Sequence, residues 1–310
     1  MKRFVKIYTY WLLGILLFTG CDDYLKEDSG DLLIPGKVEE FLPMLYREGF
    51  PRNFDDEVAW LYLMTDDVEM GQLELDPDDE NNDTRDKNSV DAFSVGEDEE
   101  PYKWERDIKS YADNFWERRY GNILACNLVI DALPEMVYVE ADSGSYNFLA
   151  AQAYAMRAYH YWCLVNSYAL PWSKENLDEP GVVIRTEPQI DIAARRRSSI
   201  REVYDLINED IENAEKYIKV ATFDGNIHRL SEPAILLLAS RIALFQENWD
   251  EVIRTGKLFL AQNSIILNLN DQDTTLFGTE KGLSNKIFTM MDGTINKEVV
   301  FTFGTSSYSP

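Results

Sequence analysis

The chain has 310 residues, of which 45% are hydrophobic and 13% aromatic, so it can bury a sizeable core and hold one or two domains. Its formal net charge of −25 gives a surface that repels phosphates, which excludes nucleic acid as an expected partner. Only two histidines occur and no Cys-x-x-Cys pair is present, so the sequence predicts no zinc site.

The N-terminus has the layout of a secretory signal peptide. A basic start is followed by an apolar run over 11–18, too short to span a bilayer comfortably, and then by Cys21. The sequence Phe-Thr-Gly-Cys resembles a bacterial lipobox, in which the cysteine becomes the acylated first residue. We expect residues 1–20 to be a lipoprotein signal peptide, Cys21 to be lipidated and residues 21–36 to form a flexible acidic tether. The alternative is an ordinary signal peptide with a coincidental cysteine.

A long polar segment over 66–102 separates two short amphipathic helices, predicted at 37–47 and 57–64, from the rest of the chain. Its middle is dense in carboxylates, which raises the possibility of bound calcium. An EF-hand needs Gly and Glu at its sixth and twelfth positions, where this loop has Asn81 and Lys87. The sequence therefore favours a solvated loop without metal.

The segment 146–168 is predicted to be one long helix, uninterrupted by Gly or Pro, at the centre of the fold. Alanines and aromatic residues occupy more than one of its faces, which predicts a helix packed between partners. Arg157 lies in its middle and argues against a membrane span, because a charge at the bilayer centre is costly. We expect an ion pair for Arg157 within the scaffold, the alternative being an acidic ligand. His160 and His228 are predicted to be structural.

Other helices are predicted on both sides of this segment. Ser199 and Glu202 have the spacing of a capping box, and Pro233 stands in a helical first turn. A short strand is predicted over 298–303. The fold class is therefore mainly α, a tetratricopeptide-like helical-repeat scaffold with long irregular loops and a few short strands. The further helices are predicted at 104–133, from 199 to beyond 214, at 231–246 and at 249–261.

Five sequence blocks, in order, carry a resemblance to a known family. They are the stripe Trp116, Tyr120, Ile123, Asn127 and Ile130, and the segments 153–172, 197–214, 234–249 and 296–301. Together with the lipobox, they resemble the RagB/SusD family of nutrient-binding outer-membrane lipoproteins. The family usually continues beyond the last block, so residues 37–310 are expected to be the N-terminal portion of a SusD-like helical domain.

The resemblance implies a lipid-anchored protein of the outer-membrane surface. Such proteins sit on a SusC-like TonB-dependent transporter, capture an oligosaccharide, or sometimes a peptide, and hand it to the barrel. The resemblance implies neither enzymatic activity nor a cofactor. One alternative is an enzyme that uses a carboxylate pair, but no catalytic motif is present. The other is an intracellular or periplasmic helical-repeat adaptor without a small ligand. Such an adaptor would not need an N-terminus with basic residues, an apolar run and a cysteine.

Glycan sites use aromatic faces against sugar C–H groups, with polar groups fixing orientation. Phe93 and Trp104 lie in or at the edge of the long polar segment, so they are the predicted ligand contacts. Trp116, Tyr159 and Trp249 lie on helical stripes and are predicted to belong to the core.

Overall fold

A computed structural model describes part of the chain. The predicted helix at 57–64, the polar segment 66–102 and the first 36 residues lie outside that part. So do the calcium-like loop and three predicted site residues, Cys21, Phe93 and Trp104. The described residues are 37–51, 109–136, 138, 140–189, 194–266 and 297–302.

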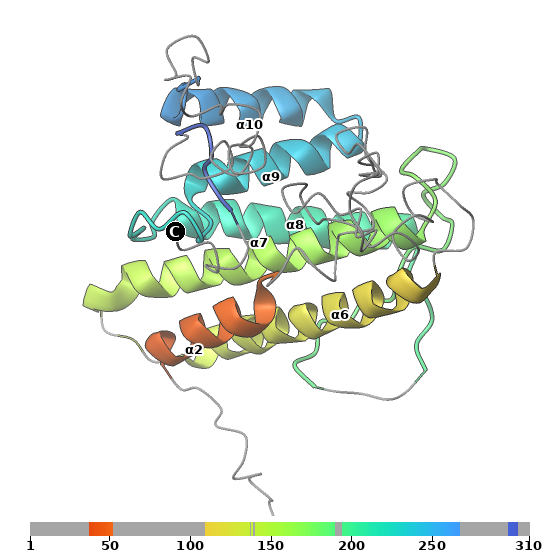
Figure 1. Cartoon of the computed structure of the whole chain (residues 1–310), viewed down its shortest axis with the longest axis horizontal. Helices are drawn as coiled ribbons and strands as arrows, with labels where there is room; N and C mark the ends of the chain where they lie inside the picture. The colour runs from red at the N-terminus through yellow and green to blue at the C-terminus, as the bar shows by residue number, and fades with distance from the viewer. Residues whose placement is uncertain are drawn as a thin grey trace, which may run out of the picture. The chain divides into compact units, whose positions relative to one another are not determined.

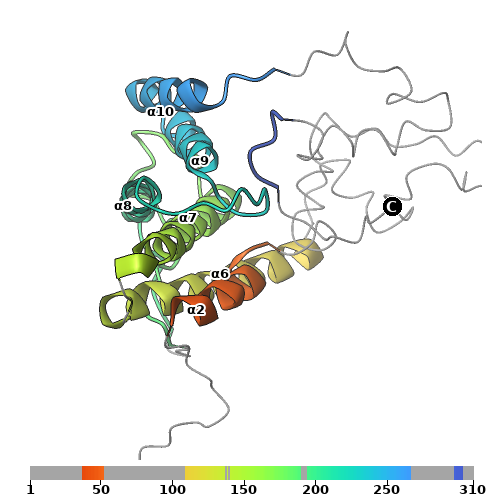
Figure 2. The ribbon, with the colours of Figure 1, turned by 90° about the vertical axis from the view of Figure 1, so that its left-hand side faces the viewer.

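The described residues form a stack of helices (Figure 1). Figures 1 and 2 show α6 to α10 following one another in chain order, with α2 beside the α6 end of the stack. This arrangement confirms the mainly α, tetratricopeptide-like fold class. The helices are α2 (Val38–Met44), α6 (Lys109–Ala132), α7 (Ser143–Tyr168), α8 (Ile200–Ile218), α9 (Glu232–Phe245) and α10 (Trp249–Gln262), with a π-helical turn η2 (Leu45–Gly49) and 3-10 turns η3 (Leu133–Glu135) and η4 (Glu140–Asp142).

Local side-chain caps set where the later helices begin. The Ser199 hydroxyl accepts a hydrogen bond from the Glu202 N–H at 3.2 Å, and the Glu202 carboxylate accepts one from the Ser199 N–H at 2.7 Å, which confirms the predicted capping box. Ser231 caps α9, and Asn248 caps α10 in the same way. These bonds satisfy N–H groups that have no partner inside a helix.

Helix α7 is the centre of the fold. It packs against α6 on one side and α8 on the other, as its two-sided apolar pattern predicted. Alanines are fully buried along it, because the neighbouring helices approach closely there. In the described part of the chain, no helix is both long and apolar enough to cross a bilayer.

The prediction of a strand over 298–303 is wrong at the residues of this segment that the structure describes. Residues 299–302 have no regular structure, and Thr302 reaches its neighbour through one backbone hydrogen bond, donated to the Ile227 carbonyl at 3.1 Å. A strand needs a partner strand to form a ladder, and a loop lies opposite instead. Among the described residues, the β pairing is limited to an isolated bridge between Pro180 and Ser199.

The prediction that Trp249 belongs to the core is also wrong. Its side chain is 58% exposed at the start of α10. Helix α10 ends the described stack and packs against α9 on one side. An apolar residue on its other side has no described helix to cover it.

Candidate ligand-binding groove

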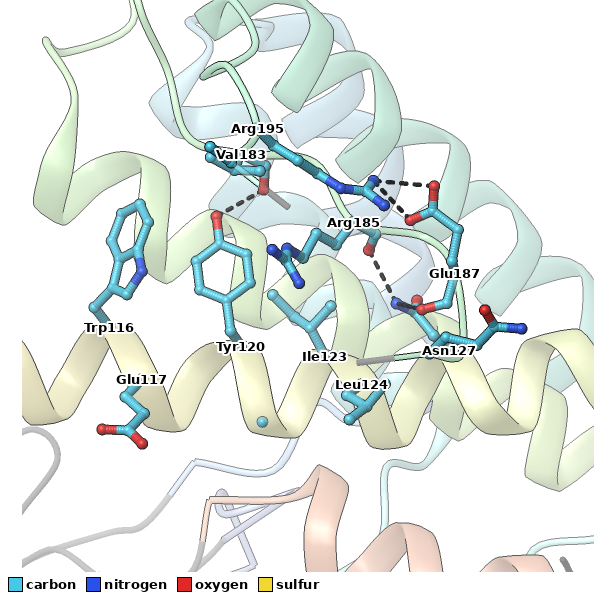
Figure 3. A pocket seen from close by; sticks show the side chains of 13 residues that line it. Trp116, Glu117, Tyr120, Ile123, Leu124, Asn127, Val183, Arg185, Glu187 and Arg195 are labelled. Atoms are coloured by element: carbon cyan, nitrogen blue, oxygen red, sulfur yellow. Dashed lines mark hydrogen bonds and ion pairs between the residues drawn. The ribbon is translucent and has the colours of Figure 1, made fainter. Parts of the chain in front are cut away.

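A groove of 630 Å³ lies between α6 and the extended chain that follows α7. Figure 3 shows Trp116, Tyr120 and Ile123 rising from α6 into this space, whereas Glu117 turns away from it. The three inward residues follow helical spacing of four and three, so they share one face of α6. The opposite wall is the segment 183–195, where the structure describes it.

Long-range hydrogen bonds hold that wall in place. The Tyr120 hydroxyl donates to the Val183 carbonyl at 2.6 Å, and the Asn127 amide donates to the Arg185 carbonyl at 2.9 Å. From α7, the Tyr161 hydroxyl donates to the Arg185 carbonyl at 2.7 Å and accepts from its N–H at 2.8 Å. The extended segment thereby has its backbone groups satisfied by side chains rather than by a sheet.

The aromatic wall of the groove is built from rings in mutual contact. The Trp116 ring lies 4.9 Å from the Tyr120 ring and 4.9 Å from the Tyr168 ring, between centroids. Trp116 is half-buried and packs against a core cluster, as predicted, and it also lines the groove. Tyr159, by contrast, packs beside the buried His160 and under the Arg119 guanidinium, consistent with the predicted core position.

Charged side chains form the rim of the groove. The Arg195 guanidinium pairs with both carboxylate oxygens of Glu187, at 2.9 and 3.0 Å. Figure 3 shows this pair above the groove, with Arg185 extending toward Tyr120. Burial raises the pKa of Tyr120, which keeps the phenol protonated as the donor to Val183. The rim therefore offers both charged and amide groups next to an aromatic wall.

A buried ion pair supports the inner end of the groove. Arg157 donates two hydrogen bonds to the Asp210 carboxylate, at 2.8 and 2.7 Å, and one to the Asn127 side-chain oxygen at 2.9 Å. The two charged side chains are 7% and 1% exposed. Burial raises the pKa of Asp210 to about 6, against the effect of the guanidinium. The expected ion pair of Arg157 within the scaffold is confirmed, and it fixes the orientation of Asn127.

The histidines are structural, as predicted. The His160 ring is buried between Arg119, 3.1 Å away at Nδ1, and the Gly49 carbonyl, 2.8 Å away at Nε2. His228 Nδ1 lies 3.1 Å from the Thr302 carbonyl. In the ranges described, no three His, Cys, Asp or Glu side chains gather as a metal site.

Sequence reasoning missed the groove because its two walls are about 60 residues apart in the chain. The usable signal was the stripe on α6, which mixes two aromatic residues with an asparagine. The polar atoms of such a stripe need hydrogen-bond partners, which points to a second wall packed against it. Phe93 and Trp104, the predicted ligand contacts, stay predictions since they lie outside the described residues.

A family model described as "Starch-binding associating with outer membrane", of the SusD-like class, matches residues 50–244. The chain belongs to the SusD-like family. This confirms the resemblance drawn from the five sequence blocks. A curated relative, SusD-like protein P38 of Formosa agariphila, is 28% identical over 158 residues, which cover 50% of this chain and 27% of that protein.

Solved SusD-like structures share the fold. A SusD superfamily protein of Bacteroides vulgatus has a TM-score of 0.57 at 16% identity, over 77% of this chain and 50% of that one. A laminarin-binding SusD-like protein has a TM-score of 0.51 at 17% identity, over 72% of this chain and 42% of that one. The chain thus spans about a quarter of the curated relative and about half of these solved structures.

Proposed function

We propose that this SusD-like protein is a non-enzymatic, lipid-anchored protein of the cell surface that binds an oligosaccharide and passes it to a SusC-like TonB-dependent transporter. The observation that carries the proposal is the α6 groove, with Trp116 and Tyr120 on one wall and a charged rim above them. The family description, which names starch binding and the outer membrane, supports it.

The chemistry of the groove suits a sugar better than a charged or wholly apolar ligand. Indole and phenol rings bind the C–H faces of a pyranose and have polar edges for its hydroxyls. Arg195 and Glu187 neutralise each other, so the rim has hydrogen-bonding groups without a strong excess of one sign. A neutral, polyhydroxylated ligand matches this combination.

The N-terminal part of the proposal rests on sequence. Residues 1–20 would direct export, Cys21 would carry the acyl chains, and residues 21–36 would tether the domain over 37–310. A flexible tether lets a binding domain move over a transporter without leaving the membrane.

Glycan binding is tested by calorimetric titration with a starch-derived α-glucan, with laminarin, and with a peptide mixture as the rival ligand. We expect one glucan to bind, and Trp116→Ala to weaken its affinity about tenfold because the main stacking face is lost. Trp249→Ala removes an equally large, more exposed indole elsewhere and should leave affinity unchanged. Binding of peptides but no glycan, or full affinity in Trp116→Ala, contradicts the proposal.

The anchor is tested by intact-mass analysis of the membrane fraction, beside a Cys21→Ala variant. We expect an acylated mass on the processed chain and loss of membrane association in the variant. A cleaved chain without lipid would exclude the anchor, and retention in the cytosol would favour the helical-repeat adaptor.

A further inference from the structure

Four tyrosines form a continuous row on the α7–α8 side of the stack. The row, Tyr138, Tyr146, Tyr217 and Tyr154, draws one residue from the loop before η4, two from α7 and one from α8. Tyr138 stacks on Tyr146 with centroids 4.3 Å apart, Tyr146 meets Tyr217 edge-on at 6.4 Å, and Tyr217 stacks on Tyr154 at 5.9 Å.

The row lies at the protein surface. Tyr138 is 43% exposed, and the other three side chains are half-buried. The Tyr146 hydroxyl donates to the Leu133 carbonyl at 3.2 Å. The hydroxyls of Tyr138, Tyr154 and Tyr217 form no hydrogen bond with any residue that the structure describes. Burial raises the pKa of Tyr146 and Tyr154, so these phenols stay protonated.

The buried Arg157 side chain links the tyrosine row to a residue that lines the α6 groove. The Arg157 guanidinium lies over the Tyr154 ring at 5.7 Å and donates to the side-chain oxygen of Asn127, which lines the groove. On α7, Tyr154, Arg157 and Tyr161 follow spacing of three and four and so share one face. Tyr161 on that face holds the opposite wall of the groove through Arg185. The groove and the row are therefore joined by one buried support.

We propose that the tyrosine row is a second set of glycan subsites, continuous with the α6 groove, and that the preferred ligand is a linear oligosaccharide long enough to reach from Trp116 to Tyr138. This inference rests on the proposed function and specifies the length of its ligand. Partly exposed tyrosines offer ring surface and hydroxyls to a ligand at low entropic cost.

The test is calorimetric titration with the oligosaccharides of whichever glucan binds, from the disaccharide to the heptasaccharide. We expect affinity to rise with chain length. Tyr138→Ala and Tyr217→Ala should lower the affinity for the longest oligosaccharide about five- to tenfold and leave that for the disaccharide unchanged. Tyr217→Phe keeps the ring and should retain most of the affinity.

The outcomes separate the two proposals. If no glucan binds the unaltered protein, both the proposed function and the proposed role of the tyrosine row are rejected. If a glucan binds but its affinity does not depend on length, the tyrosine row is not a glycan site, whereas the groove remains one. The same conclusion follows if Tyr138→Ala and Tyr217→Ala bind the heptasaccharide with unchanged affinity. Tyr138 lies in a loop and is well exposed, so its variant reports on binding even where Tyr217→Ala lowers stability. Trp249→Ala is the control.

Discussion

The α6–α7–α8 region and the α9–α10 pair differ in which side chains they bury and which they expose. In the first region, Arg157, Asp210 and Gln152 are buried and hydrogen-bonded, and they tie α7 to α8 and to the loop before α9. In the second, large apolar side chains such as Trp249 and Ile253 lie exposed on α10. Hydropathy alone would have assigned these positions the other way round.

The difference shows that position in the stack decides burial. Helix α7 has neighbours on both sides, so even its charged residue is enclosed and must find a partner. Helix α10 packs mainly against α9 and meets α8 through the Arg254–Glu215 ion pair, and Thr255 is its fully buried side chain. This contrast should be visible in the stability that each side chain contributes.

Removing the buried Asp210 carboxylate should have the largest effect on stability. Asp210→Ala leaves the Arg157 charge enclosed without its partner, and we expect the free energy of unfolding to fall by about 3–5 kcal/mol in urea denaturation. The control is Asp178→Ala, which breaks the Arg201 pair at side-chain exposures of 87% and 49% and should cost about 1 kcal/mol at most. Equal losses in the two variants would contradict the contrast.

Replacing a buried amide should have the next largest effect. The Gln152 side chain donates to the Leu230 carbonyl and accepts from its N–H, both at 2.8 Å. Gln152→Met keeps the volume and leaves both backbone groups unpaired, so we expect a loss of about 2 kcal/mol by thermal denaturation. Gln262→Met, on the exposed end of α10, is the matched control and should change stability little. An unchanged stability in Gln152→Met would mean that water forms hydrogen bonds with the two Leu230 backbone groups in place of the amide.

Acid should destabilise the protein through His160. Burial, then the Arg119 charge, hold the pKa of His160 well below its usual value, so the folded state keeps it neutral. The unfolded chain binds that proton near pH 6.5, so the stabilisation is complete above this pH and falls as the pH drops below it.

Between about pH 7.5 and about pH 5.5 the expected loss from His160 is about 1.4 kcal/mol. Urea denaturation at the two pH values measures it, and His160→Gln should show a pH dependence smaller by that amount. An unchanged pH dependence in the variant would mean that His160 is accessible to protons in the folded state.

Replacing an exposed apolar residue on α10 should have the smallest effect on stability. Ile253→Ser removes a large side chain from the outward face of the helix. We expect a change in the free energy of unfolding within about 0.5 kcal/mol. The same substitution at the fully buried Ile207 of α8 should be strongly destabilising and serves as the positive control. A large loss from Ile253→Ser would show that this face is covered in the intact protein.

The helices of the stack were largely predictable because their signals are local. The Ser199 capping box involves atoms three residues apart, and Pro233 and Asn248 act within their own helical turns. The α7 pattern also predicted a two-sided environment. The helix boundaries in the structure differ from the predicted ones by a few residues. Helix α7, for example, begins at Ser143 rather than at Tyr146.

The groove was not predictable in the same way. Trp116 and Trp249 look alike in sequence, each on an amphipathic stripe, yet one lines a cavity and the other faces outward. The difference lies in the wall supplied by Val183 and Arg185, which no local pattern links to α6. The predicted strand over 298–303 failed for the same reason, because a strand exists only with a partner.

The sequence by itself determined the helical composition, the caps, the family and the expected export address at Cys21, since each depends on residues close together in the chain. The tertiary structure alone decided which aromatic rings meet, how Arg157 and Asp210 pair across α7 and α8, and where the groove and the tyrosine row lie. Those features depend on contacts between residues tens of positions apart, where burial and partner geometry, rather than local propensity, set the free energy.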